Sequence, residues 1–352
     1  MNIEIQRSTT RRIRVPADQL GFGKYFADHM ATMEFEKGAW KNPRIVPYGP
    51  ISLEPGASVL HYGQAMFEGM KAFRGKGGKL FLFRPVFHAK RMAAGAARLC
   101  MPSPPQEEFL SLIRSLVKLD QDWVPAERGS ALYLRPTLIG SESFLGVRAS
   151  DSYLFFIINS PVGAYYAEGF SPVKIWVEEQ YIRAAPGGLG AVKAGANYAA
   201  SLLASQEAKK KGFSQVLWLD AVEKKYIEEV GTMNVFFRIG DTVITPSLDG
   251  TILAGATRDC VIALLKEWKV KLEERPISLT EVFAAHKSGE LKEVFGSGTA
   301  AVVSPVGELT TSTQKYSINS GKVGELTQRL YDEITAIQYG EKPDTHGWIE
   351  EI

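Results

Sequence analysis

A single lysine within a long stretch almost free of charge constrains this chain more than any other feature of its sequence. Lys193 lies in residues 180–206, where Arg183 is the one other charged residue and most positions are Ala, Gly or Leu. Surface lysines usually have acids and other charges around them. A nucleophilic lysine needs the reverse, because desolvation disfavours the ammonium form and frees the amine. The stretch therefore has two interpretations: a nucleophile, or a lysine whose stem lies along a helix start while its amine reaches solvent.

Composition describes an ordinary globular protein and excludes several classes. The 352 residues are 45% hydrophobic and 23% charged, which favours two domains with ample core. The net charge of +2, without a block of like charge, gives no indication of nucleic acid. The apolar run 153–158 is far shorter than the ~20 residues of a membrane-spanning helix, so we expect no membrane partner.

The two cysteines and the first residues indicate where the protein works. Cys100 and Cys260 fit no metal-ligand or disulfide pattern, which is typical of a reducing compartment. Residues 1–20 lack the apolar stretch of a signal peptide. We therefore expect a cytoplasmic protein without a metal site.

The order of predicted elements divides the chain into two parts. Short strands come first, and residues 106–119 then repeat apolar side chains at helical spacing. A buried strand over 153–159 leads into a segment with Pro161 and two glycines, which is typical of a linker. We expect a small N-terminal domain over 1–157, an interdomain loop over 158–170 and a large C-terminal domain over 171–352.

Three short stretches in the second half carry residues suited to binding charge. Glu229 lies at the edge of an apolar strand, where a carboxylate is costly without a partner such as an Arg or Lys. Thr257 precedes a predicted helix over 259–268, and such a junction is either an anion site or an ordinary helix start with Thr257 as its cap. Residues 295–300 combine glycines and hydroxyls, as in an anion-binding nest or a plain turn.

Two further positions have open interpretations. The predicted strand 132–136 puts Tyr133 and Arg135 on one face, where they bind a carboxylate or stack at a sheet edge. Asn197 is expected to cap a helix that runs to about Lys211.

Together these features match the requirements of pyridoxal 5′-phosphate. Its aldehyde needs a lysine amine, its pyridine nitrogen needs a carboxylate to stay protonated, and its phosphate needs a nest and a cation. The chain offers Lys193, Glu229, a tyrosine five residues after the lysine, and two anion nests.

At these residues the chain resembles the branched-chain amino acid aminotransferases, which are fold type IV pyridoxal-phosphate enzymes. The resemblance covers nearly the whole chain, from Gly21 to Trp348. The motifs that carry it are Phe67–Gly75, Leu132–Pro136, Lys193–Tyr198, Glu229–Asn234 and Phe295–Ala300. It implies an α+β or α/β architecture of two domains, of which the larger has a β-barrel-like core.

The resemblance also implies a role for each matching residue. Lys193 would bind the cofactor covalently and move the proton at the substrate, Tyr198 would bond to the ring hydroxyl, and Glu229 would face the pyridine nitrogen. The phosphate would be held by Arg91, Ala256, Thr257 and Thr299, with help from Ser297. The substrate would contact Phe22, Tyr62, Phe67, Tyr133, Arg135, Tyr165, Thr232, Thr299 and Ala300.

The activity implied is ping-pong transamination of L-leucine, L-isoleucine and L-valine with 2-oxoglutarate by a homodimer. Arg135, Tyr62 and Tyr133 are expected to accept the side-chain carboxylate of glutamate. Two alternatives stay open: another fold type IV enzyme, such as a D-amino acid aminotransferase or aminodeoxychorismate lyase, and a non-catalytic phosphate-binding protein of the same fold.

Overall fold

The computed structural model describes residues 2–163 and 170–352, so Tyr165 lies outside the described residues. The chain divides into two compact units, and each is described by itself. Unit 1 comprises Met1–Tyr165, Val192–Ala196 and Ala336–Ile352, and unit 2 comprises Tyr166–Ala191 and Asn197–Thr335. The domain limits expected from the sequence, at residues 157 and 171, stay a prediction.

Unit 1 is built on one long sheet that contains both the first and the last strand of the chain. Its order is β1 (Glu4–Ile5), β3 (Ala39–Pro47), β2 (His29–Glu36), β8 (Tyr153–Val162), β7 (Ala131–Gly140), β5 (Met70–Arg74), β6 (Leu80–Phe83) and β18 (Ile349–Glu351), while β4 (Ala65–Phe67) pairs with β7. The β1–β3 pair is parallel, and the pairs from β3 to β18 are antiparallel.

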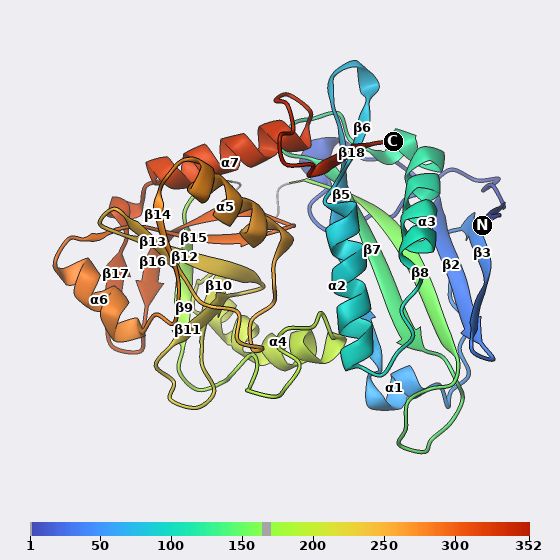
Figure 1. Cartoon of the computed structure of the whole chain (residues 1–352), viewed down its shortest axis with the longest axis horizontal. Helices are drawn as coiled ribbons and strands as arrows, with labels where there is room; N and C mark the ends of the chain where they lie inside the picture. Colours follow the sequence, from blue (N-terminus) through green and yellow to red (C-terminus); the bar gives the residue numbers. More distant parts are fainter. Residues whose placement is uncertain (1, 164–169) are drawn as a thin grey trace. The chain divides into compact units, whose positions relative to one another are not determined.

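Two helices cover one face of this sheet (Figure 1). They are α2 (Pro85–Arg98) and α3 (Gln106–Leu119), and the range predicted for α3 is confirmed. Their apolar stripes, such as Met92 on α2 and Phe109 on α3, join strand residues in a single core. Shorter helices complete the unit: α1 (Ser58–Tyr62), η1 (Ala17–Gln19), η2 (Lys76–Gly78) and η3 (Gln121–Trp123).

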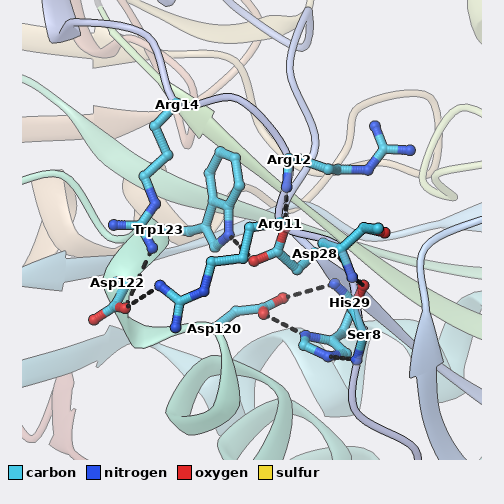
Figure 2. A network of polar contacts seen from close by, with 10 residues as sticks. Ser8, Arg11, Arg12, Arg14, Asp28, His29, Asp120, Asp122 and Trp123 are labelled. Carbon is cyan, nitrogen blue, oxygen red and sulfur yellow. Dashed lines mark hydrogen bonds and ion pairs between the residues drawn. The ribbon is translucent and has the colours of Figure 1, made fainter.

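The N-terminal segment is fixed to this sheet by a polar network (Figure 2). The Ser8 backbone N–H donates to Nε2 of His29 at 2.8 Å, and Nδ1 of His29 lies 2.6 Å from Asp120. Asp28 accepts from the Arg12 backbone at 2.7 Å and from the indole of Trp123 at 3.0 Å. Ser8 and Arg12 are therefore tied to residues at and beside the start of β2.

Unit 2 contains a closed barrel of six strands, which confirms the predicted barrel-like core. Around the ring the strands are β11 (Ile227–Val230), β10 (Gln215–Leu219), β9 (Val173–Glu178), β16 (Val302–Thr310), β15 (Leu291–Gly298) and β12 (Met233–Ile239). The β11–β12 pairing closes the ring through a tight turn at Gly231, whose φ of 58° suits glycine. Strands β13 (Thr242–Thr245), β14 (Lys271–Glu274) and β17 (Lys315–Ser317) extend the sheet outside the ring.

Alternating apolar residues of the barrel strands form the core of unit 2. On β9 these are Val173, Ile175 and Val177, and on β12 they are Val235 and Phe237. Around the barrel lie α4 (Gly195–Lys210), α5 (Ala256–Glu267), α6 (Leu279–Lys287), η4 (Asn319–Gly321) and α7 (Glu325–Gln338). The unit boundary falls within α4 and within α7. In the described ranges, no helix is long and apolar enough to span a membrane.

Two predicted helix starts are wrong. Helix α4 begins at Gly195, so Asn197 lies inside it, and its side-chain amide instead donates to the Leu189 carbonyl at 2.8 Å. Helix α5 begins at Ala256 with Gly255 as its N-cap, so Thr257 is a helical residue and not the cap. In both cases the helix starts earlier than predicted, at Gly195 in α4 and directly after Gly255 in α5.

Candidate functional site

Lys193 lies beside the short strand β4 in unit 1. Its carbonyl accepts from the Phe67 backbone N–H at 3.1 Å, and Ala194 bridges to Met66. Its Nζ lies 5.0 Å from the centroid of the Phe67 ring. The side chain is half-buried, and desolvation, helped by Arg91, lowers its pKa to about 8. A useful fraction of neutral amine is therefore present near pH 7, which favours the nucleophile interpretation.

Arg91 is held in place by a fully buried carboxylate. Its Nε and Nη2 lie 2.7 and 2.8 Å from the two oxygens of Glu68, which also faces Nδ1 of His88 at 2.8 Å. Burial raises the pKa of Glu68, but Arg91 and His88 outweigh this and hold it well below its usual range. A guanidinium has five N–H donors, and Glu68 uses two, so Glu68 orients Arg91 without saturating it.

One face of β4, β5 and β7 gathers aromatic and cationic side chains. The Arg135 guanidinium stacks 4.4 Å above the Phe67 ring, and its Nη2 donates to the Tyr133 hydroxyl at 3.0 Å. Phe22 meets Tyr133 edge to face at 5.0 Å between centroids. A Cβ on Gly69 would collide with the Tyr133 hydroxyl, so glycine is required there. Arg135 therefore stacks on an aromatic ring, although on the inner strand β7 and not at a sheet edge, and its binding of a carboxylate stays a prediction.

Lys71 was not predicted from the sequence and belongs to the same face. It pairs directly with Tyr133 across β5 and β7, which puts the two side chains on one side of the sheet. The side chain is 6% exposed, and burial lowers its pKa to about 8. A charged residue among the apolar side chains of Met70, Ala72 and Phe73 was the signal in the sequence, whereas Glu68 lies between β4 and β5 and had no such signal.

Tyr62 is placed differently from the other expected substrate residues. It lies on the exposed helix α1, and its hydroxyl donates to the Leu145 carbonyl. Its ring contact is with His61, and within residues 2–163 none of its hydrogen bonds or ring contacts is to Phe67, Tyr133 or Arg135.

In unit 2, the expected residues gather around the start of β12. Asn234 pairs with Glu229 of β11 on one side and with Ser297 of β15 on the other. Its side-chain amide donates to the Leu253 carbonyl at 2.8 Å, which brings the loop before α5 to the same place. The turn that joins β11 to β12 contains Thr232.

Glu229 is a buried carboxylate with defined partners. One oxygen, Oε1, accepts from the Leu253 backbone N–H at 2.9 Å, and the other, Oε2, lies 3.3 Å from Nε of Arg183. The partner required by a carboxylate in an apolar strand is therefore an arginine. Tyr198 lies on α4 of the same unit, where its carbonyl accepts from Ser201 at 2.8 Å.

Two places in unit 2 have the donors that a phosphate needs. Ala256 and Thr257 are the first buried residues of α5, a helix long enough to direct its backbone N–H groups and positive dipole end at an anion. A Cβ on Gly255 would collide with Asn234, so the chain needs glycine there. Ser297 is 1% exposed, and among the described residues its hydroxyl has no hydrogen-bond partner. It precedes the β15–β16 turn that contains Thr299 and Ala300.

These observations fit the expected cofactor. The chain supplies an amine with a lowered pKa, a buried acid paired with an arginine, a helix start whose dipole favours an anion and a buried hydroxyl without a hydrogen-bond partner among the described residues. Unit 1 carries Phe22, Tyr62, Phe67, Arg91, Tyr133, Arg135 and Lys193; unit 2 carries Tyr198, Glu229, Thr232, Ala256, Thr257, Ser297, Thr299 and Ala300.

Comparison with known proteins gives consistent results. A family model described as amino-transferase class IV matches residues 65–309. The branched-chain-amino-acid aminotransferase 2 of Bacillus subtilis (strain 168) is 50% identical over 352 residues, which cover 99% of this chain and 97% of the relative. The crystal structure of the Escherichia coli branched-chain amino acid aminotransferase matches with a TM-score of 0.76 and 26% identity, covering 92% of this chain and 98% of the other. The crystal structure of a T.th. branched-chain amino acid aminotransferase with pyridoxamine 5′-phosphate matches with a TM-score of 0.75 and 25% identity, covering 91% of this chain and 98% of the other.

Proposed function

The chain belongs to the branched-chain-amino-acid aminotransferases of the class IV family, and we infer that it exchanges amino groups between L-leucine, L-isoleucine or L-valine and 2-oxoglutarate. Its cofactor is pyridoxal 5′-phosphate. The observation that carries the inference is the setting of the Lys193 amine, which lies 5.0 Å from the Phe67 ring in a segment almost free of charge, where desolvation lowers its pKa to about 8.

Each residue group has a proposed task toward the bound cofactor. Pyridoxal 5′-phosphate supplies an electron-withdrawing ring that stabilises negative charge next to the reacting amino group. Lys193 would bind the cofactor through its amine and would move the proton at the substrate Cα. Glu229 would face the ring nitrogen, and Tyr198 would bond to the ring hydroxyl.

We assign the phosphate to a charged donor and to neutral hydrogen-bond donors of the chain. Arg91 supplies charge, and its orientation by Glu68 supports this role. The backbone N–H groups of Ala256 and Thr257, at the start of α5, supply neutral hydrogen-bond donors. The hydroxyls of Ser297 and Thr299 complete the set, and the buried hydroxyl of Ser297 supports its inclusion.

The proposed substrate site must accept both an apolar side chain and a carboxylate. The rings of Phe22, Phe67 and Tyr133 suit leucine, isoleucine and valine, because they exclude water from a branched aliphatic group. Arg135 and Tyr133 are already joined by a hydrogen bond and suit the side-chain carboxylate of glutamate. Lys71, on the same face, adds a second cation for a substrate with two carboxylates. The proposed substrate site also includes Tyr62, Tyr165, Thr232 and Ala300.

We propose that the protein acts as a homodimer. Helix α1 and the loop after β7 expose large apolar side chains on neighbouring segments of unit 1, which are tied together by the Tyr62–Leu145 hydrogen bond. The exposed residues are Leu60, Tyr62, Phe144, Leu145 and Val147. An exposed cluster of this kind suits a second copy of the chain.

We also propose a cytoplasmic location. Cys100 and Cys260 are both free thiols, and one is exposed. Free thiols persist in reducing compartments.

The absorption spectrum of the purified protein tests this function. We expect a yellow protein that bleaches with L-leucine and recovers with 2-oxoglutarate, which reports both half-reactions. A yellow protein that responds to D-alanine and not to L-leucine would move the substrate to a D-amino acid aminotransferase. A colourless protein that pyridoxal phosphate cannot reconstitute would favour a non-catalytic role.

A further inference from the structure

Arg183 connects three segments of unit 2 with one guanidinium group. It lies between β9 and α4, and its side chain is 9% exposed. Its Nη2 donates to the Gly190 carbonyl at 3.1 Å and also to the Thr251 carbonyl. Its Nε lies 3.3 Å from Oε2 of Glu229.

The two carbonyls belong to loops that matter for the site. Gly190 is three residues before Lys193, and Thr251 lies in the loop that leads to the start of α5. The loops are in such close contact that a Cβ on Gly190 would collide with the Thr251 backbone. Arg183 therefore donates hydrogen bonds to both loops where they touch, so a displacement of Arg183 would displace both loops.

Arg183 also stabilises the charge of Glu229. The Nε–Oε2 pair is close enough for a strong ionic interaction but is not aligned as a hydrogen bond. It therefore favours the ionised carboxylate without taking a lone pair of Oε2 through a hydrogen bond. The Leu253 N–H, from the loop that Arg183 also binds, fixes the other oxygen at 2.9 Å.

Other acids near Glu229 make the positive charge of Arg183 important. Glu228, the neighbour of Glu229, is 5% exposed, and its pKa is raised by burial although Arg183 acts to lower it. Asp249 adds a third acid and accepts from Thr251 at 2.9 Å. Asp249 is exposed, so Arg183 offsets two buried acids, Glu228 and Glu229, in a place with little water, where an isolated carboxylate would become protonated.

We propose that Arg183 is a positioning residue for transamination: it keeps Glu229 ionised toward the ring nitrogen of the cofactor and fixes the Gly190 loop against the loop before α5. The proposal rests on the proposed function, because that function assigns Glu229 to the ring nitrogen. Loss of the guanidinium leaves Glu229 with a higher proton affinity, so the proton shared with the ring moves toward the carboxylate.

The test uses the holoenzyme with ¹⁵N-labelled pyridoxal phosphate and the variants Arg183→Gln, Arg183→Lys and Glu229→Gln. The ¹⁵N chemical shift of the ring nitrogen reports its protonation, and the single-turnover rate with L-leucine reports catalysis. For Arg183→Gln we expect a shift toward unprotonated pyridine and a rate lower by roughly 10- to 100-fold, the range for residues that orient metal ligands. Arg183→Lys should keep the ring nitrogen protonated but weaken cofactor binding, because it keeps the charge and loses the planar guanidinium whose Nη2 binds both carbonyls.

Arg238→Gln is the matched control. It removes an arginine from the buried Glu293, 2.8 Å away in the same barrel, so it imposes a similar structural loss elsewhere. In Arg238→Gln, the ¹⁵N chemical shift of the ring nitrogen should equal that of the wild type. If Arg183→Gln fails to fold, the cofactor affinities of Arg183→Lys and Arg238→Gln still test the positioning role. Weaker cofactor binding by Arg183→Lys than by Arg238→Gln supports the role, and equal affinities would overturn it.

Glu229→Gln separates this proposal from the function on which it rests. If Glu229→Gln leaves the ring nitrogen protonated, the assignment of Glu229 is wrong. If it removes the proton while Arg183→Gln does not, the role of Arg183 is wrong and the function stands. In the double variant Arg183→Gln/Glu229→Gln, the ¹⁵N chemical shift of the ring nitrogen should differ little from that of Glu229→Gln alone, since the two residues act on one proton.

Discussion

The buried Lys71 leads to an unusual prediction, namely that removal of a charged residue stabilises the protein. Its pKa falls from an ordinary value of 10.5 to about 8 because burial disfavours the ammonium form. At about 1.4 kcal/mol for each pKa unit, this fall corresponds to about 3 kcal/mol. Lys71→Met keeps most of the side-chain volume and removes the amine, so the variant should gain up to about 3 kcal/mol in the free energy of unfolding at pH 7.

The pH dependence of this gain identifies its cause. Below pH 8 the lysine is protonated in both the folded and the unfolded protein, so the full cost of burying the charge is present. Between pH 8 and 10.5 the folded protein has lost the proton and the unfolded chain has not, so the stability of the wild type rises with pH. The advantage of Lys71→Met should therefore fall to under about 1 kcal/mol at pH 10. Lys193 titrates over a similar range but is present in both proteins.

Urea unfolding at matched protein concentration, at pH 7 and pH 10, measures the effect. Lys118→Met, at an exposed lysine of α3, is the control and should change the free energy of unfolding by less than about 0.5 kcal/mol. An equal gain at both pH values would mean that packing and not charge burial is responsible. A loss of stability at pH 7 would refute the reasoning, because contacts of the amine would then outweigh its desolvation.

Three further predictions concern the site. Lys193→Ala should abolish transamination while pyridoxal phosphate still binds by fluorescence titration, and near-normal turnover would contradict its role. Arg135→Ala should lower kcat/KM for L-glutamate at least about 10-fold more than for L-leucine, since it removes a cation from the carboxylate; equal losses would remove Arg135 from that role. Glu68→Gln should weaken cofactor binding roughly 10- to 100-fold because Arg91 loses its orienting partner. Since the pKa of Glu68 is depressed, its contribution to stability is present above its ordinary value of 4.5 and is lost as the pH falls below it. Acid unfolding should thus become less steep in Glu68→Gln, and an unchanged acid transition would contradict the ion pair.

The parts of this protein that follow local patterns were predictable from the sequence. The apolar stripe of residues 106–119 predicted α3 at the observed limits, because helix period and burial depend on adjacent turns. The unusual setting of Lys193 also pointed to an amine with a lowered pKa. Both signals are contained in a few neighbouring residues.

Features that depend on distant parts of the chain were not predictable. Arg91 is 23 residues from Glu68, and Arg183 is far along the chain from Glu229, so no local pattern pairs them. Lys71 offered a signal, a charge among the apolar side chains of one strand, but the residue it pairs with comes from another strand. Glu68, between β4 and β5, offered no such signal. The start of α5 was missed because its N-cap, Gly255, has no side chain to mark the cap in the sequence.

The two edges of the unit 1 sheet have a consequence for synthesis of the chain. One edge strand is β1, at the beginning, and the other is β18 (Ile349–Glu351), which pairs with β6. Unit 2 is therefore translated as an insertion inside unit 1. The barrel can close on the ribosome while the sheet of unit 1 still lacks its last strand. Unit 1 completes its sheet only after Glu351 leaves the exit tunnel, so a nascent chain stalled within α7 would expose the unpaired edge of β6 to other chains.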